Sequence, residues 1–212
     1  VTEGDYDLSS SAFVDSFTAT TLGVTDDGYL KVGSTSTGDN NMGFGFTWTG
    51  ILENYRAKYV VARYRIVGGN STDKLLVSSV QKWLQTSSTA KIPLDYTNAG
   101  WNTIVVDRNV NSENMIWSGE TLFIQFPNLK DTNAYFVIDY IGFCETQVAA
   151  DATKAAIEKA NAPVSSTTEN RRYGTSAFGL YFKPIVATDG KVSAKAYRTL
   201  ASGYDNYYSV TE

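Results

Sequence analysis

The stretch that most constrains how this chain can fold is Tyr135–Cys144, which reads Tyr-Phe-Val-Ile-Asp-Tyr-Ile-Gly-Phe-Cys. Side chains of a strand point alternately to its two faces, and both faces of this stretch are apolar. One face carries Tyr135, Val137, Ile141 and Phe143, and the other carries Phe136, Ile138 and Tyr140. A strand that is apolar on both faces is covered on both faces. The stretch therefore predicts a strand in the interior of a sheet.

Asp139 is the exception within this apolar stretch. Burying a bare carboxylate is very costly, so Asp139 must be hydrogen-bonded, ion-paired or bound to a cation. The simplest interpretation is a structural carboxylate with a polar partner. The alternative is a ligand of a structural calcium ion, for which a single aspartate is weak evidence. We expect no other cofactor.

The composition narrows the class of protein. A length of 212 residues, of which 42% are hydrophobic and 19% charged, predicts a globular chain with one large domain, or with a large and a small one. The net charge of −4 and the absence of a long run of Lys or Arg argue against binding to nucleic acid. No apolar stretch approaches the length of a membrane span, so we expect no membrane insertion.

The chain contains no His, which excludes Ser-His and Cys-His catalysis and removes the commonest zinc ligand. Catalysis would have to use carboxylates, Tyr or Lys, and no motif singles out a pair among the 22 acidic residues. We therefore expect that the protein is not an enzyme; a fragment of a carboxylate-based glycoside hydrolase is the less favoured alternative. The single Cys144 cannot close an intramolecular disulfide, and we expect a buried, inert thiol.

Short apolar runs separated by turn residues recur throughout the first two thirds of the chain. The clearest is Tyr59–Ile66, whose even-numbered residues are apolar while its other face carries Tyr59, Val61, Arg63 and Arg65. Further extended segments are expected at residues 29–32, 42–48, 74–83, 92–96, 101–107 and 121–126. Because no helix pattern separates these strands, we expect an all-β fold, an antiparallel β-sandwich over residues 1–145.

Residues 146–162 break the strand pattern and predict a helix. Thr146 can cap its start, Pro163 stops it, and Glu158 follows Lys154 by four residues. The expected apolar stripe consists of Val148, Ala152, Ala156 and Ala160. Because this stripe is mostly Ala, the helix buries little and serves as a connector as easily as part of the core.

Residues 163–212 begin with a polar loop and continue as a predicted β-hairpin. Its strands are Ala177–Val186 and Lys191–Leu200, joined by the turn Thr188-Asp189-Gly190. An isolated hairpin is marginally stable in water, so this segment must find partners. We expect it to pack on the sandwich; the alternative is the start of a further module that has been cut away.

Six short motifs follow one another along the chain: Asp-Asp-Gly-Tyr-Leu (26–30), Tyr-Val-Val-Ala-Arg-Tyr-Arg (59–65), Gly-Trp-Asn-Thr-Ile-Val-Val-Asp (100–107), Trp-Ser-Gly (117–119), Leu-Phe-Ile-Gln-Phe (122–126) and Ile-Asp-Tyr-Ile-Gly-Phe (138–143). In this order they resemble jelly-roll carbohydrate-binding modules from large secreted and surface proteins of anaerobic Gram-positive bacteria, including starch-adherence proteins. The resemblance covers roughly residues 5 to 145. It implies a secreted or cell-surface location, a polysaccharide or oligosaccharide as partner and other modules of a larger surface protein as neighbours. It also implies that an aspartate in the place of Asp139 sometimes helps to bind calcium.

Sugar binding needs an aromatic ring that stacks on a pyranose and planar polar groups that reach its hydroxyls. Trp101 starts a strand and is interpreted as structural. The predicted function is a non-catalytic extracellular polysaccharide-binding module; the alternative is a structural spacer or a protein-adhesion module. The resemblance to starch-adherence proteins alone favours α-glucan such as starch, and xylan or β-glucan would fit the sequence as well. The candidate binding residues are the aromatic Trp48, Trp83, Trp117 and Tyr59 and the basic Arg63 and Arg65.

Overall fold

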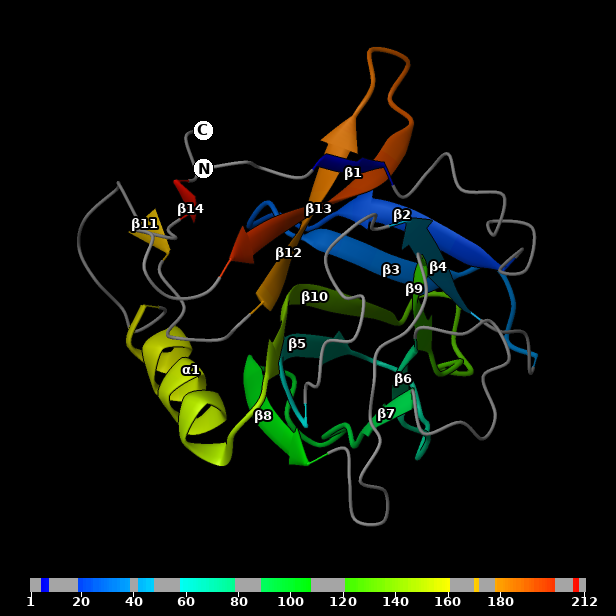
Figure 1. Ribbon diagram of the computed structural model, residues 1–212. Coiled ribbons are helices and arrows are strands. Elements are labelled where there is room, and N and C mark those ends of the chain that lie inside the picture. Colours follow the sequence, from blue (N-terminus) through cyan, green and yellow to red (C-terminus); the bar gives the residue numbers. More distant parts are fainter. Residues whose placement is uncertain are drawn as a thin grey trace.

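The computed structural model describes residues 5–7, 19–38, 42–47, 58–78, 89–107, 121–160, 170–171, 178–200 and 208–209. The larger sheet, sheet A, is arranged around β10 (Tyr135–Cys144), which lies near the centre of Figure 1. On one side β5 (Tyr59–Val67) pairs with β10 along its whole length. On the other side β10 pairs first with β3 (Leu30–Ser34) and then with β12 (Phe178–Val186). The prediction of an interior strand is therefore confirmed.

The remaining strands extend these pairings, and every pairing among the described strands is antiparallel. In sheet A, β2 pairs with β3, and β8 pairs with β5. Next to β12, β13 pairs with β12, and β1 pairs with β13 at the edge. Sheet B has the order β4-β9-β6-β7, and β11 and β14 form a separate short pair. The bounds are β1 (Asp5–Asp7), β2 (Thr20–Val24), β4 (Met42–Thr47), β6 (Leu75–Ser78), β7 (Thr89–Ile92), β8 (Asn102–Asp107), β9 (Thr121–Phe126), β11 (Asn170–Arg171), β13 (Val192–Leu200) and β14 (Tyr208–Ser209).

The main hydrophobic core joins residues of both sheets. Strand β5 shows why the sequence folds this way, because its alternate apolar residues all enter this core as predicted. Sheet B contributes inward residues such as Leu75, Val77 and Ile124, all at most 1% exposed. Two packed antiparallel sheets around one apolar layer make the all-β sandwich that the strand spacing predicts. From β5 the core residues are Val60, Ala62, Tyr64 and Ile66.

Strand β10 departs from simple alternation at Asp139. The register with β5 shifts between Ile138, which is opposite Tyr64, and Tyr140, which is opposite Arg63. Asp139 is therefore the extra residue of a β-bulge, and the faces of the strand exchange at this point. Phe136 and Ile138 enter the main core before the bulge, and Ile141 and Phe143 enter it after the bulge. The predicted strict alternation, which placed these two pairs on opposite faces, is wrong beyond Ile138.

Helix α1 (Gln147–Ala160) lies against the outer face of sheet A, the face turned away from sheet B. The predicted cap is confirmed, because the Ala149 backbone N–H donates a 3.2 Å hydrogen bond to Thr146 Oγ1. The second hydrophobic cluster joins the helix to the sheet; it contains Tyr59, Val61, Tyr140, Cys144, Tyr181, Ala150 and Ile157.

The predicted apolar stripe of α1 is wrong. Val148 is 79% exposed, whereas Ala150, Thr153 and Ile157 are buried. Ile157 buries much more apolar area than an alanine does. The face of the helix that carries Ile157 therefore packs against the sheet. Lys154 and Glu158 form an i,i+4 ion pair at 3.8 Å on the exposed side. Within the described residues, no helix is long and apolar enough to cross a membrane.

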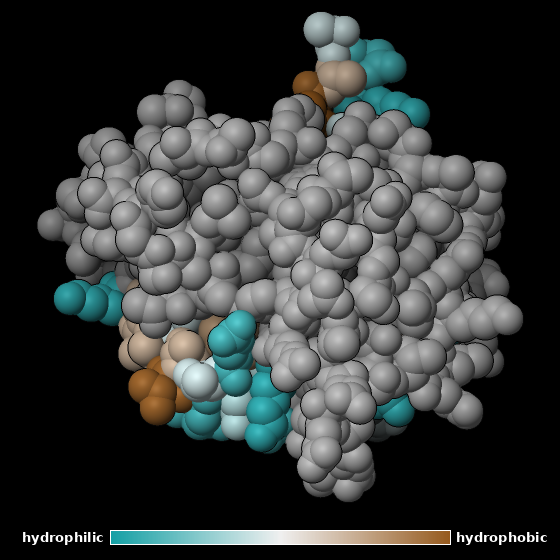
Figure 2. Space-filling view, viewed as in Figure 1, coloured by the Kyte–Doolittle hydropathy of each residue, from teal (hydrophilic) through white to brown (hydrophobic). Residues whose placement is uncertain are grey.

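The C-terminal hairpin β12–β13 is part of sheet A, because β12 continues the hydrogen bonding of β10 from Tyr140 to Phe143. Phe182 and Ala194 from this hairpin enter the main core. Beyond these contacts the hairpin continues outward, and residues 186–191 are exposed. Figures 1 and 2 show this tip projecting at the top of the view.

Candidate functional site

The chemically richest group of described side chains lies on the outer face of sheet A. We call it the outer-face cluster, and it joins the turn between β2 and β3 to strands β5, β8 and β10. Sequence neighbours do not build it, because Asp27 and Arg65 are 38 residues apart and Arg63 and Asp139 are 76 residues apart. The cluster consists of Asp27, Tyr29, Arg63, Arg65, Trp101 and Asp139.

The buried part of the cluster is the ion pair of Arg63 and Asp139. Arg63 Nη1 lies 2.6 Å from Asp139 Oδ2, and the two side chains are only 4% and 5% exposed. Residues 63 and 65 point to the same face of β5, and the bulge in β10 adds Asp139 beside Arg63. From the sequence, Asp139 needs a hydrogen bond, an ion pair or a bound cation. In the structure it is paired with an arginine.

The guanidinium groups of Arg63 and Arg65 both lie over the ring of Trp101. Arg63 Cζ lies 3.7 Å and Arg65 Cζ lies 4.8 Å from the centroid of the indole. Tyr29 meets the same indole in an edge arrangement, with centroids 4.7 Å apart and planes at 63°. Arg63 Cζ is 5.7 Å from the Tyr29 centroid. This is well below the sum of the distances from Arg63 to the indole and from Tyr29 to the indole. Tyr29 therefore lies beside the indole rather than across it from Arg63.

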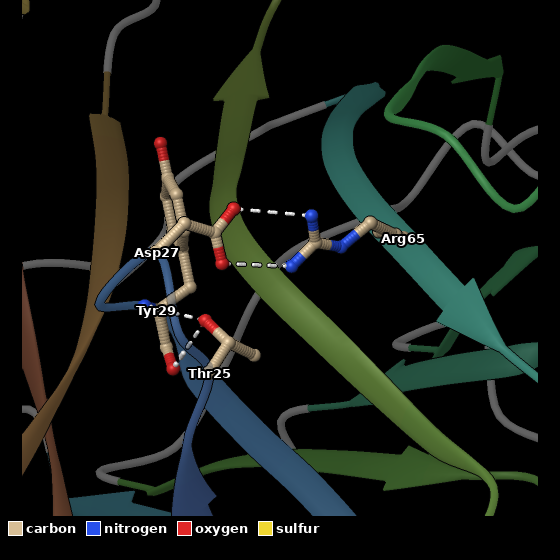
Figure 3. A network of polar contacts seen from close by, with 4 residues as sticks. All are labelled: Thr25, Asp27, Tyr29 and Arg65. Atoms are coloured by element: carbon tan, nitrogen blue, oxygen red, sulfur yellow. Dashed lines mark hydrogen bonds and ion pairs between the residues drawn. The ribbon is translucent and has the colours of Figure 1, made fainter.

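Arg65 and Asp27 form the exposed part of the cluster (Figure 3). Arg65 Nη1 and Nη2 donate to the two carboxylate oxygens of Asp27 at 3.1 and 3.0 Å. This two-point geometry holds the carboxylate in one plane. The Asp27 side chain is 46% exposed and that of Arg65 is 19% exposed, so the fork reaches solvent.

A tight turn presents Asp27 and Tyr29 to the sheet. Thr25 Oγ1 accepts a 2.9 Å hydrogen bond from the Tyr29 N–H, and the Gly28 N–H donates to the Thr25 carbonyl at 2.8 Å. Partial burial opposes ionisation of Asp27, but hydrogen bonds from Arg65 and Thr25 and the charge of Arg65 outweigh it and lower its pKa. Asp27 is therefore a fixed carboxylate at neutral pH.

This arrangement can accept hydroxyl groups and offer aromatic surface, because Tyr29 and Trp101 are both partly exposed. The Asp27 side chain is 46% exposed, so a ligand hydroxyl can reach its carboxylate from solvent. Among the described residues no group of three or more Cys, Asp or Glu is placed to hold a metal ion.

The residues predicted from sequence divide into three groups. Trp48, Trp83 and Trp117 lie outside the described residues. Tyr59 and Arg63 are 8% and 3% exposed, so they offer a ligand almost no surface, and we leave them out of the proposed binding surface. Arg65 reaches the surface as part of the fork. Trp101, interpreted as structural, lies partly exposed on the outer face of sheet A.

Sequence reasoning missed Asp27 and Tyr29 as members of a site. Both belong to Asp-Asp-Gly-Tyr-Leu (26–30), in which the sequence predicts only an extended segment that starts at Tyr29. The available signal was the position of Arg63 and Arg65 on one strand face, since two arginines on one face need acidic or aromatic neighbours.

Comparisons with protein-family models, with curated proteins and with solved structures found no match to this chain.

Proposed function

We propose that this chain is a non-catalytic polysaccharide-binding domain whose ligand meets the exposed part of the outer-face cluster. The observation that carries the proposal is the placement of two partly exposed aromatic rings, Tyr29 and Trp101, beside the exposed Arg65–Asp27 fork. An aromatic surface beside a fixed planar polar group matches a pyranose, which has an apolar C–H face and hydroxyls at its edge.

The roles of the residues follow from their chemistry. The carboxylate of Asp27 accepts a sugar hydroxyl, and Arg65 keeps that carboxylate ionised and in plane. The rings of Tyr29 and Trp101 provide the apolar contact. We propose α-glucan such as starch as the first ligand to test, on the basis of the resemblance to starch-adherence proteins. A secreted or cell-surface location is part of the same proposal.

Affinity is expected in the micromolar to millimolar range. A few contacts offset only part of the cost of ordering a flexible glycan chain, and each tenfold change in Kd corresponds to about 1.4 kcal/mol. This range is measurable by calorimetry with short oligosaccharides.

The test is a pull-down of the whole chain on insoluble starch, xylan, cellulose and chitin, followed by calorimetry with oligosaccharides of the retained polymer. The Asp27→Ala variant should weaken binding at least about tenfold, because a hydrogen bond to a charged group is worth roughly 1.5–3 kcal/mol. The matched control is Asp189→Ala, an exposed aspartate whose Oδ1 accepts the Lys191 N–H at 3.0 Å in the hairpin turn. This control should bind like the wild-type chain.

Two outcomes would contradict the proposal. Retention on none of the four polymers would favour a spacer or protein-adhesion module. Release of reducing sugar from any of them would show an enzyme, in which case the carboxylates would have to be examined for a catalytic pair.

A further inference from the structure

The bulge in β10 carries two features that cost free energy. Asp139 and Arg63 are removed from water, and the desolvation of such a pair can exceed the attraction between its charges. The bulge also interrupts hydrogen bonding in the central strand of sheet A. Departures of this kind from local rules concentrate at functional sites, so the contacts of this pair point to a functional role.

The pair contacts the indole of Trp101 through Arg63. Asp139 fixes one end of the Arg63 guanidinium at 2.6 Å, and that guanidinium lies 3.7 Å from the indole centroid. The indole in turn meets Tyr29 at 4.7 Å. A continuous set of contacts therefore leads from a buried carboxylate to two rings that reach the surface. Arg63 and Asp139 are too deeply buried to touch a ligand themselves.

The bulge is what allows this arrangement. Tyr140 lies opposite Arg63 and packs in the cluster under α1, with its ring centroid 4.9 Å from that of Tyr181. In a regular strand only one residue could occupy that position on the outer face. The extra residue lets both Asp139 and Tyr140 lie beside Arg63, while Ile141 still enters the main core.

We propose that Asp139 and Arg63 are positioning residues, which orient Trp101 for ligand binding without contacting the ligand. This inference rests on the proposed function, because it assigns the two buried residues to the same binding surface. It also predicts which property of Arg63 matters. The planar guanidinium stacks on an indole, whereas the ammonium of a lysine keeps the charge but loses the planar contact.

The test uses near-ultraviolet circular dichroism of the whole chain, with the Trp101 signal defined as the difference between the wild-type and Trp101→Phe spectra. Arg63→Lys and Asp139→Asn should each reduce this signal by at least half and weaken glycan binding at least fivefold. The Arg63→Lys variant keeps a cation that can pair with Asp139. It therefore provides the test if the Asp139→Asn variant does not fold. Far-ultraviolet spectra establish that the sandwich persists.

The matched control is Lys58→Met. Lys58 Nζ lies 5.5 Å from the centroid of Tyr59, so this variant removes a cation–ring contact at the other end of β5 from Arg65. It should change neither the Trp101 signal nor the affinity. An unchanged Trp101 signal and affinity in Arg63→Lys would overturn this inference and leave the proposed function standing. Failure of the wild-type chain to bind any polysaccharide would instead overturn the proposed function.

Discussion

Replacing Gly69 by alanine should destabilise the fold much more than replacing Gly190 by alanine. Both glycines have φ of +83°, in the left-handed region that side chains disfavour, so the two substitutions share the same backbone penalty. They differ in their surroundings. A Cβ at Gly190, in the hairpin tip, would have no heavy atom within 4 Å. A Cβ at Gly69 would lie 2.7 Å from Leu129 Cβ and 2.9 Å from Leu129 O.

The magnitudes follow from these distances. The shared backbone penalty is about 1–2 kcal/mol, which is the whole effect expected at Gly190. At Gly69 the neighbour cannot easily move, because Leu129 is 1% exposed and its carbonyl accepts a 2.8 Å hydrogen bond from the Asn70 N–H. Forcing extra volume into such a site costs typically about 1–3 kcal/mol more. The expected loss at Gly69 is therefore about 2–5 kcal/mol.

The measurement is unfolding in urea, followed by tryptophan fluorescence and by far-ultraviolet circular dichroism, for the wild-type chain and both variants. The difference between the two midpoints, converted with a common slope, isolates the steric part because the backbone part cancels. Equal losses of stability in the two variants would refute the reasoning, since they would show that the contacts of Gly69 with Leu129 add nothing to its conformational requirement.

Three further predictions concern β10 and α1. Gly142→Ala should cost about 1–3 kcal/mol in urea unfolding, because its Cβ would lie 2.6 Å from the Oη of the fully buried Tyr140. Burial raises the pKa of the Cys144 thiol from 9.0 to about 11, so the unfolded chain loses this proton at lower pH than the native chain. The stability that the neutral thiol contributes is complete below pH 9 and lost as the pH rises through about 11; unfolding measured across this range should show a decline that Cys144→Ala reduces. Thr146→Ala removes the cap on the Ala149 N–H and should lower stability by about 0.5–2 kcal/mol, whereas no change in the thermal midpoint would show that the cap is dispensable.

The sequence predicts the strands well because burial follows a period of two. In β5 the alternation identifies both faces correctly, and the bounds of β9 and β10 agree with the structure residue for residue. The bulge at Asp139 escapes this reasoning, since the residues around it read as one uninterrupted apolar run. The pairing of Asp139 with Arg63 across the sheet accommodates the extra residue there.

The buried face of α1 and the contacts of Asp27 escape the sequence for related reasons. Spacing predicts a stripe of Val148 and three alanines, but the buried face of α1 is the one whose Ile157 packs on the outer face of sheet A. The fork between Asp27 and Arg65 depends on how a turn folds over a distant strand. No local pattern contains that information, because the β2–β3 turn and β5 become neighbours only through β10.

Along one side, β10 pairs first with β3 and then with β12, which is made much later in the chain. Sheet A therefore cannot be completed on this side until late in synthesis. The half of β10 that pairs with β12 has no partner on that side until the hairpin has been made, more than 30 residues later in the chain. At about 5–20 residues per second, the ribosome takes several seconds to reach the end of β13. During that time the backbone groups of this half present an open edge to other chains. A released chain that ends within residues 145–177 should therefore aggregate through this edge, and the hairpin ends that exposure when it pairs.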